Sequence, residues 1–166
     1  MNLITRVLGK GPQSPSPIVY VKRLSTTFTT SNGTNAQEIT ALTITGLTPG
    51  KLYRATFSGY YLGGSAGDRG HLWMQHGVST SKDSFQYFGA IGTLPSTTVN
   101  SYCFSKTFKM DSFASVKVLL AHSTGTSSSF VGNDGNIPPS AYPGGLNPTT
   151  YLIVEELQSN TVFNFS

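Results

Sequence analysis

The stretch TTYLIVEELQSNTVFNFS, residues 149–166, is the most apolar run in the sequence. Terminal segments fray unless pairing or packing holds them, and so many aliphatic and aromatic side chains are costly to leave in water. The run therefore predicts that TYLIVEEL, residues 150–157, is a strand in the middle of a sheet, paired on both sides. We expect Ile153 to point into the core, on the same face as Tyr151 and Leu157.

The composition indicates an all-β protein with one domain. The chain has 166 residues, of which 11% are charged, 18 are glycine and 9 are proline. Glycine and proline favour turns, and the abundant β-branched and aromatic residues favour strands over helices. The single cysteine, Cys103, lies in an apolar stretch and is expected in the core. Stability must therefore come from packing, without an internal disulfide.

Alternation along KLYRATFSGYYL, residues 51–62, defines one strand clearly, with Tyr53, Phe57 and Tyr61 on the same face. Further strands are predicted at residues 18–24, 38–47, 71–77, 84–92, 101–110 and 112–122. A long tract rich in Ser, Gly and Pro follows at 123–150, and no segment shows sustained helical periodicity. About eight to ten strands of this kind predict an antiparallel β-sandwich or jelly roll.

Positive charge and proline distinguish the first residues from the rest. Residues 1–30 hold four basic residues and no acid, whereas residues 31–166 sum to zero, so the net charge of +4 lies in the first part. The three prolines of GKGPQSPSP, residues 9–17, exclude a regular helix or a central strand. We therefore divide the chain into an extended N-terminal arm, residues 1–17, and a single β-sandwich domain, residues 18–166.

This arm is the candidate binding element, because an apolar tip precedes its basic and proline-rich part. An extended segment can add main-chain hydrogen bonds to the sheet edge of a neighbour. The alternative is a disordered tail before an ordinary first strand. The candidate binding residues are Leu3, Ile4, Arg6, Val7, Lys10, Lys22 and Arg23.

Residues able to catalyse a reaction or bind a metal do not form a recognisable pattern. His71 and His76 are five positions apart on a predicted strand and face opposite ways, so they cannot chelate one metal ion without a bulge. Glu155 and Glu156 are adjacent and also diverge, which excludes an acid–base pair. One of them is expected to be buried or near a subunit contact, where it needs an Arg, Lys or backbone partner. We expect no enzymatic activity, no cofactor and no metal site.

Nucleic-acid and membrane binding are also disfavoured. The basic residues of the first part are spread over residues 6–23, whereas phosphate-binding tracks are denser. No apolar run approaches the roughly 20 residues that span a bilayer. The first residues lack the unbroken apolar stretch of a signal peptide, so we expect a soluble protein synthesised in a host cytoplasm.

Three motifs stand out in the body of the chain: LTPGKLYRATFSGYY (47–61), FKMDSFASVKVLL (108–120) and TTYLIVEEL (149–157). Together they resemble the small trimeric jelly-roll proteins of tailed-phage virions, which are similar in plan to tumour-necrosis-factor and complement-C1q heads. The resemblance implies a homotrimer on the capsid surface of a virion. It further implies a capsid cement (decoration) protein, whose partner is the major capsid protein of the shell and whose arm clamps neighbouring capsomers.

A carbohydrate-binding role is the alternative, in which the chain is the receptor-binding head of a phage tail fibre or a lectin-like module. The aromatic residues able to stack on a glycan are Tyr60, Tyr61, Trp73, Tyr87 and Tyr142. The competing interpretation places these rings in the core or at a trimer interface. We favour the cement role because a fibre head normally follows a long shaft, whereas only residues 1–17 precede the first predicted strand.

Overall fold

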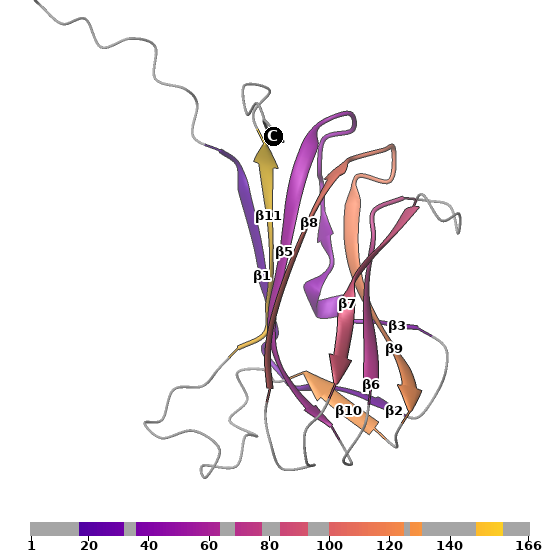
Figure 1. The fold of residues 1–166 in the computed structure, drawn as a ribbon. Coiled ribbons are helices and arrows are strands. Elements are labelled where there is room, and N and C mark those ends of the chain that lie inside the picture. The colour runs from indigo at the N-terminus through magenta and orange to yellow at the C-terminus, as the bar shows by residue number, and fades with distance from the viewer. Residues whose placement is uncertain are drawn as a thin grey trace, which may run out of the picture.

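Two antiparallel β-sheets stacked as a sandwich form the body of the protein in the computed structural model (Figure 1). The structure describes residues 17–31, 36–63, 69–77, 84–92, 100–124, 127–130 and 149–157. The regular elements within these residues are strands and one 3₁₀-helix, which confirms the all-β class. None of these residues belongs to a helix long and apolar enough to cross a membrane.

The strands have a jelly-roll arrangement, with most sheet neighbours remote in sequence. In chain order the elements are β1 (Val19–Arg23), β2 (Phe28–Ser31), β3 (Gln37–Glu38), η1 (Thr40–Leu42), β4 (Ile44–Thr45), β5 (Leu52–Gly63), β6 (Arg69–Gln75), β7 (Phe85–Gly92), β8 (Asn100–Lys109), β9 (Ser115–Thr124), β10 (Ser127–Phe130) and β11 (Tyr151–Leu157). In sheet 1 the strands β1, β11, β5 and β8 lie side by side in that order. The last residues of β5 also pair with β10, which in turn pairs with β2. Sheet 2 has the order β3-β9-β6-β7, and β4 also pairs with β9.

The closing strand, β11, lies between β1 and β5 and pairs with both, which confirms its predicted central position. Its core-facing side chains are Leu152 and Val154, which are fully buried, whereas Ile153 is only half-buried. The prediction that Ile153 lies in the core is therefore wrong by one position. Side chains alternate along a strand, so a shift of one residue exchanges the two faces. The uniformly apolar run from Tyr151 to Val154 does not indicate which face is inward.

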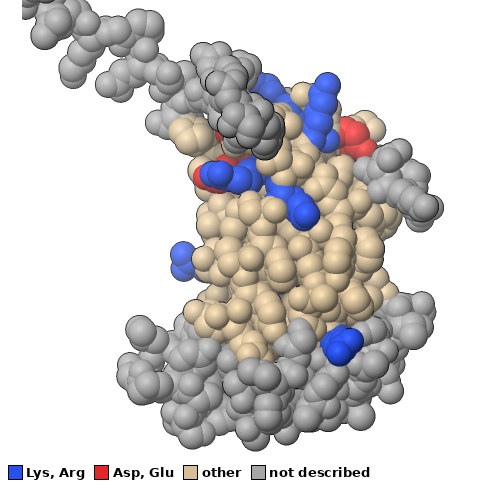
Figure 2. Space-filling view, viewed as in Figure 1, with Lys and Arg blue, Asp and Glu red and all other residues tan. Residues whose placement is uncertain are grey.

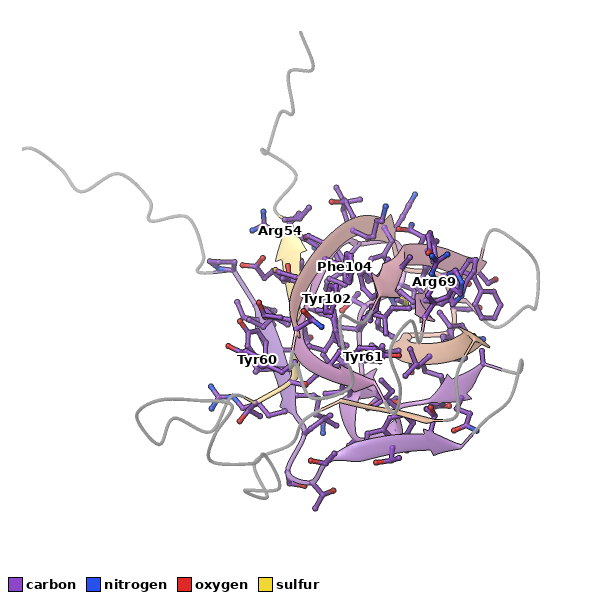
Figure 3. All side chains as sticks on the ribbon, turned by 60° about the horizontal axis from the view of Figure 1, so that its bottom comes forward. Arg54, Tyr60, Tyr61, Arg69, Tyr102 and Phe104 are labelled. Carbon is purple, nitrogen blue, oxygen red and sulfur yellow. The ribbon has the colours of Figure 1, made fainter. Side chains whose placement is uncertain are left out.

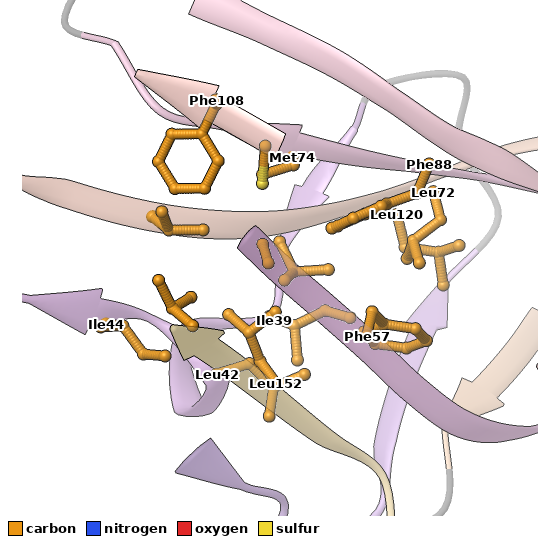
Figure 4. Packing of buried hydrophobic residues seen from close by; sticks show 14 of the residues in the cluster. Ile39, Leu42, Ile44, Phe57, Leu72, Met74, Phe88, Phe108, Leu120 and Leu152 are labelled. Atoms are coloured by element: carbon orange, nitrogen blue, oxygen red, sulfur yellow. The ribbon is translucent and has the colours of Figure 1, made fainter. Parts of the chain in front are cut away.

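The core fills the space between the two sheets (Figure 4). On β5 the predicted alternation is confirmed, because Tyr53, Phe57 and Tyr61 are all buried. Further buried side chains come from β6, β8 and β9 and from the residue that follows β8: Leu72, Met74, Phe108, Met110, Val116, Val118 and Leu120. At roughly 1.5–3 kcal/mol for each large side chain, this burial is the main favourable contribution to folding.

Residues 38–47 do not form the single strand that the sequence predicts. They comprise the end of β3, the 3₁₀-helix η1 and the strand β4. Ile39, Leu42 and Ile44 are all buried. In one continuous strand Ile39 and Leu42 would face opposite sides, so the 3₁₀ turn is what brings both of them into the core.

The turn at Thr48-Pro49-Gly50, predicted from its sequence, positions the start of β5 beside β8. Gly50 has a φ of +80°, a conformation that L-residues with a Cβ rarely adopt. Its N–H donates to the Met110 carbonyl at 2.8 Å, and the Met110 N–H donates to the Lys51 carbonyl at 2.9 Å. The turn thereby fixes the β5–β8 register from its first residue.

Candidate interaction surfaces

The candidate arm residues are described only in part. Five of the seven lie outside the residues that the structure describes: Leu3, Ile4, Arg6, Val7 and Lys10. The other two, Lys22 and Arg23, are exposed on β1. Because they are adjacent in a strand, they project from opposite sides of sheet 1. Arg23 shares the outer side with Val19 and Val21, whereas Lys22 shares the inner side with the half-buried Tyr20.

β1 carries exposed aliphatic side chains at the edge of sheet 1. Ile18, Val19 and Val21 are 54%, 47% and 48% exposed. The Glu156 N–H donates to the Ile18 carbonyl at 2.9 Å, which fixes the start of β1 against β11. Val21 lies opposite Ile153 of β11, so the aliphatic strip continues onto the next strand. We call Val19, Val21, Arg23 and Ile153 the β1 surface.

One ion pair borders the β1 surface, and a second lies on the opposite side of β11. Arg54 Nη2 is 2.7 Å from Glu155 Oε2, and Lys51 Nζ is 3.0 Å from Glu156 Oε1. The sequence predicts an Arg, Lys or backbone partner for one of these adjacent glutamates, and the structure gives a cationic partner to each. Such pairs contribute about 0–1 kcal/mol when exposed. In Figure 2 most of the visible charged side chains gather toward one end of the body, and isolated Lys or Arg side chains project farther down.

A cluster of aromatic rings lies on the outer side of sheet 2, on β6 and β7. Trp73 and Tyr87 are opposite each other across the two strands, with ring centroids 4.8 Å apart and planes inclined by 49°. His71 Nδ1 is 2.9 Å from the Tyr87 hydroxyl oxygen. Tyr87 is 38% exposed, and the other two rings are half-buried. We call His71, Trp73 and Tyr87 the aromatic platform.

An irregularity in the β6–β7 pairing creates the platform. Leu72 pairs with Gly89, but the next residue, Trp73, pairs with Tyr87. The extra residue, Phe88, is turned into the core and is 5% exposed. A bulge of this kind re-aims the side chains next to it, and here it brings the tyrosine beside the tryptophan.

The polar groups around the platform are already paired. Gln75, two positions after Trp73 on β6, donates through Nε2 to the Gly77 carbonyl at 3.1 Å. Lys117 Nζ on β9 is 2.8 Å from Glu38 Oε2 on β3. Burial acts to raise the pKa of Glu38, but hydrogen bonds from Lys117 and Thr43 outweigh it and leave this pKa lowered. These opposite charges compensate each other beside the platform, whose own residues include no Asp, Glu, Lys or Arg.

The five aromatic residues singled out from the sequence have different environments. Tyr61 is fully buried and belongs to the core, so its proposed role in glycan stacking is wrong. Tyr60 is half-buried on the opposite sheet from the platform (Figure 3). Tyr142 lies outside the described residues. Of the described members of this set, the structure therefore brings Trp73 and Tyr87 together. It also places beside them His71, for which the sequence predicted no neighbouring side chain.

The two described histidine side chains face opposite ways, as predicted. His76 is 8% exposed, its ring is 5.1 Å from the Phe108 ring, and among the described residues its Nε2 has no hydrogen-bond partner. Burial lowers the pKa of His76, and the charge of Asp111 partly opposes that shift. Packing at the end of the core thus favours the uncharged form of the imidazole.

Cys103 is not in the core, contrary to the prediction. It is exposed on β8. The sequence YCF suggested a buried strand, but β8 alternates and only Tyr102 and Phe104 turn toward the core. This alternation puts Cys103 on the opposite face from Tyr102 and Phe104, so its side chain faces outward.

The comparisons with known proteins support the fold. No protein-family model matches the chain, and no curated protein matches it by sequence. Similar solved structures include the infectious bursal disease virus Gt strain (17% identity, TM-score 0.51, 93% of this chain and 43% of that one) and the VP2 subviral particle of that virus (13%, 0.50, 92% and 42%). Eiger TNF from S. frugiperda is also similar (9%, 0.50, 86% and 93%). The chain spans less than half the length of the viral chains, and at these identities what it shares with all three proteins is the fold.

Proposed function

We propose that this protein is a non-enzymatic structural protein of a virion, a capsid cement (decoration) protein that binds the major capsid protein through its N-terminal arm and the β1 surface. One observation carries the proposal: three of the four exposed large aliphatic side chains in the described residues are on β1 or directly before it, where the chain leaves the basic, proline-rich arm. Burial of apolar area drives association and complementary charge speeds it. A lattice of folded shell protein can offer both an apolar groove and acidic surface.

The shared fold supports the proposal at a coarser level. A viral particle protein and a TNF have the same jelly-roll plan as this chain. The likeness raises the expectation of a structural role. It does not assign that role, because one fold can have many functions. The β1 surface is the feature of this chain that makes the role specific.

A homotrimer is the assembly we propose. Tyr53, Phe57 and Tyr61 are buried in the core of a single copy, so they are not available for contact with a neighbouring subunit. Tyr102 and Phe104 pack against the core from β8 but stay half-buried, with ring centroids 6.1 Å apart, so only their exposed edges can join a subunit contact (Figure 3). Permanent subunit contacts are more apolar than ordinary surface. Sedimentation should show one species of about three times 17.7 kDa at micromolar concentration, and a stable monomer would contradict this assembly.

The attachment test uses shells that lack the protein. Full-length chain, a chain without residues 1–17, and a Val21→Asp variant are mixed with these shells, and the co-sedimenting copies are counted. We expect strong loss of binding for both altered chains, because one lacks the arm and the other places a charge in the aliphatic strip. Ser101→Asp is the matched control and should bind normally. Ser101 is also exposed, but it is on β8, across sheet 1 from β1. Equal binding by all four chains would refute the attachment mode.

A further inference from the structure

The aromatic platform has the geometry of a small ligand site on a rigid element. Its rings project from two paired strands of sheet 2, and residues two apart on one strand are about 6.8 Å apart. His71 and Trp73 are at that spacing on β6, and Tyr87 bridges them from β7, 5.8 Å and 4.8 Å from their ring centroids. Three connected rings thus border one surface whose shape is set by the sheet.

The exposed apolar area is too narrow for a stable contact with another folded protein. Tyr87 is the one large hydrophobic side chain in the described part of sheet 2 that is more than a third exposed. A specific protein interface buries about 800 Å² on each partner. The area around one tyrosine and the half-buried rings beside it suits a ligand of a few ring-sized units.

The chemistry of the platform suits a polyhydroxyl ligand. Tyrosine and tryptophan present an apolar face together with a polar edge, and ligand sites combine such faces with a few polar groups that fix orientation. Sugars match both features, because one side of a pyranose is lined by C–H groups and its rim by hydroxyls. Nδ1 of His71 is in contact with the Tyr87 hydroxyl. The other ring nitrogen, Nε2, is therefore the atom that would contact a ligand hydroxyl. The charges of Lys117 and Glu38 compensate each other, and the exposed Arg69 stands at the start of β6.

We propose that the aromatic platform binds oligosaccharide, with Trp73 and Tyr87 stacking on sugar rings and His71 hydrogen-bonding to a hydroxyl. This inference does not depend on the proposed attachment to a capsid. The platform is on sheet 2 and the β1 surface is on sheet 1, so both are available on one copy. Arg69, exposed on β6 two positions before His71, lies at the end of the platform where a carboxylate-bearing sugar would contact it.

The test uses the fluorescence of Trp73, since the chain has one tryptophan. The full chain is titrated with the neutral probes chitotetraose, maltotetraose and cellotetraose, and with the acidic probes 3′-sialyllactose and tetragalacturonate. We expect a saturable change in emission with at least one probe, with a dissociation constant of about 0.1–1 mM. Tighter binding of an acidic probe that is lost in Arg69→Ala assigns a carboxylate-bearing ligand, and binding of neutral probes alone assigns a neutral one.

Three variants connect the signal to the platform. Tyr87→Ala should weaken binding at least tenfold, because it removes the exposed ring while keeping Trp73 as the reporter. Ala90→Glu, at an exposed position opposite His71, should block the site and tests it even if Tyr87→Ala unfolds. Leu52→Ala, at an equally exposed position on sheet 1, should bind like the unaltered chain. No saturable change with any probe up to about 10 mM, or unchanged affinity in Ala90→Glu, would overturn the proposal.

Discussion

Leu152 and Ile153 are neighbours on β11 that face opposite sides of sheet 1, so they form a matched pair for testing the core. Leu152 is fully buried between the sheets and Ile153 is half-buried on the outside. Truncating a buried leucine removes its transfer energy and leaves a cavity. We expect Leu152→Ala to lower the free energy of unfolding by about 3 kcal/mol and Ile153→Ala by about 1 kcal/mol. Equal losses in chemical denaturation would contradict the observed register.

His76 should make the stability of the body depend on pH. Its folded-state pKa is lowered, chiefly by burial, from an ordinary value of about 6.5. Between those two pKa values the unfolded chain binds more protons than the folded one. The stabilisation is therefore complete above about pH 6.5, and it is lost as the pH falls through the folded-state pKa.

Denaturation curves measured between about pH 5 and pH 8, the range in which histidine side chains change their charge, would show this loss of stability. His76→Phe keeps a ring against Phe108 and removes the titrating group, so its free energy of unfolding should depend less on pH in that window. His71→Phe is the matched control, because His71 is on the outer side of the same strand and only half-buried. A pH dependence that survives in His76→Phe would show that another group causes it.

At the scale of elements, the sequence was sufficient wherever a strand alternates. The faces of β5 and β9 follow directly from their period of two, and the turn at Thr48-Pro49-Gly50 follows from its residue types. Residues 38–47 could not be predicted, because the 3₁₀ turn there is imposed by the need to bury Ile39 and Leu42 together. That requirement comes from tertiary packing, which overrides local preference.

The candidate sites were predictable to different degrees for the same reason. The β1 surface follows from an apolar run placed at the edge of a sheet, and only the edge position had to come from the structure. The aromatic platform depends on the register shift after Leu72. Without that bulge the cross-strand neighbour of Trp73 would differ, and no local pattern in the sequence signals the extra residue.

β11 is the element whose loss should be most damaging. Its removal would leave β1 and β5 without their shared partner and would take Leu152 and Val154 out of the core. We expect a chain lacking residues 150–166 to be insoluble, because unpaired strand edges and exposed apolar surface promote aggregation. The chain lacking residues 1–17 is the control and should remain soluble with an unchanged near-ultraviolet circular dichroism spectrum. A soluble, cooperatively unfolding truncation at residue 150 would show that β11 is peripheral.

At the scale of the whole molecule, the sandwich separates the two candidate surfaces. Sheet 1 carries the β1 surface and sheet 2 carries the aromatic platform, on opposite sides of one core. Attachment through one sheet would therefore leave the other in solvent. A protein that binds a shell with one side and a glycan with the other needs no hinge or second domain, because the fold itself provides the separation.

Lys22 and Arg23 distinguish attachment through the β1 surface from a general attraction of positive charge. Both are exposed on β1, but only Arg23 is on the outer side with Val19 and Val21. If the aliphatic strip contacts the shell, Arg23 is within the contact and Lys22 is at its margin. We expect Arg23→Gln to weaken co-sedimentation with shells by about tenfold, equivalent to about 1.4 kcal/mol, and Lys22→Gln by about twofold.

Salt provides the second measurement for this pair. A charge inside a contact is partly desolvated and is screened less than one in solvent, where the Debye length is about 10 Å at 0.1 M ionic strength. The residual effect of Arg23→Gln should therefore persist at high salt, whereas that of Lys22→Gln should disappear. If both substitutions weaken binding equally and both effects vanish with salt, the attraction is non-specific. The β1 surface would then not be the attachment site, and the arm alone would have to account for binding to the shell.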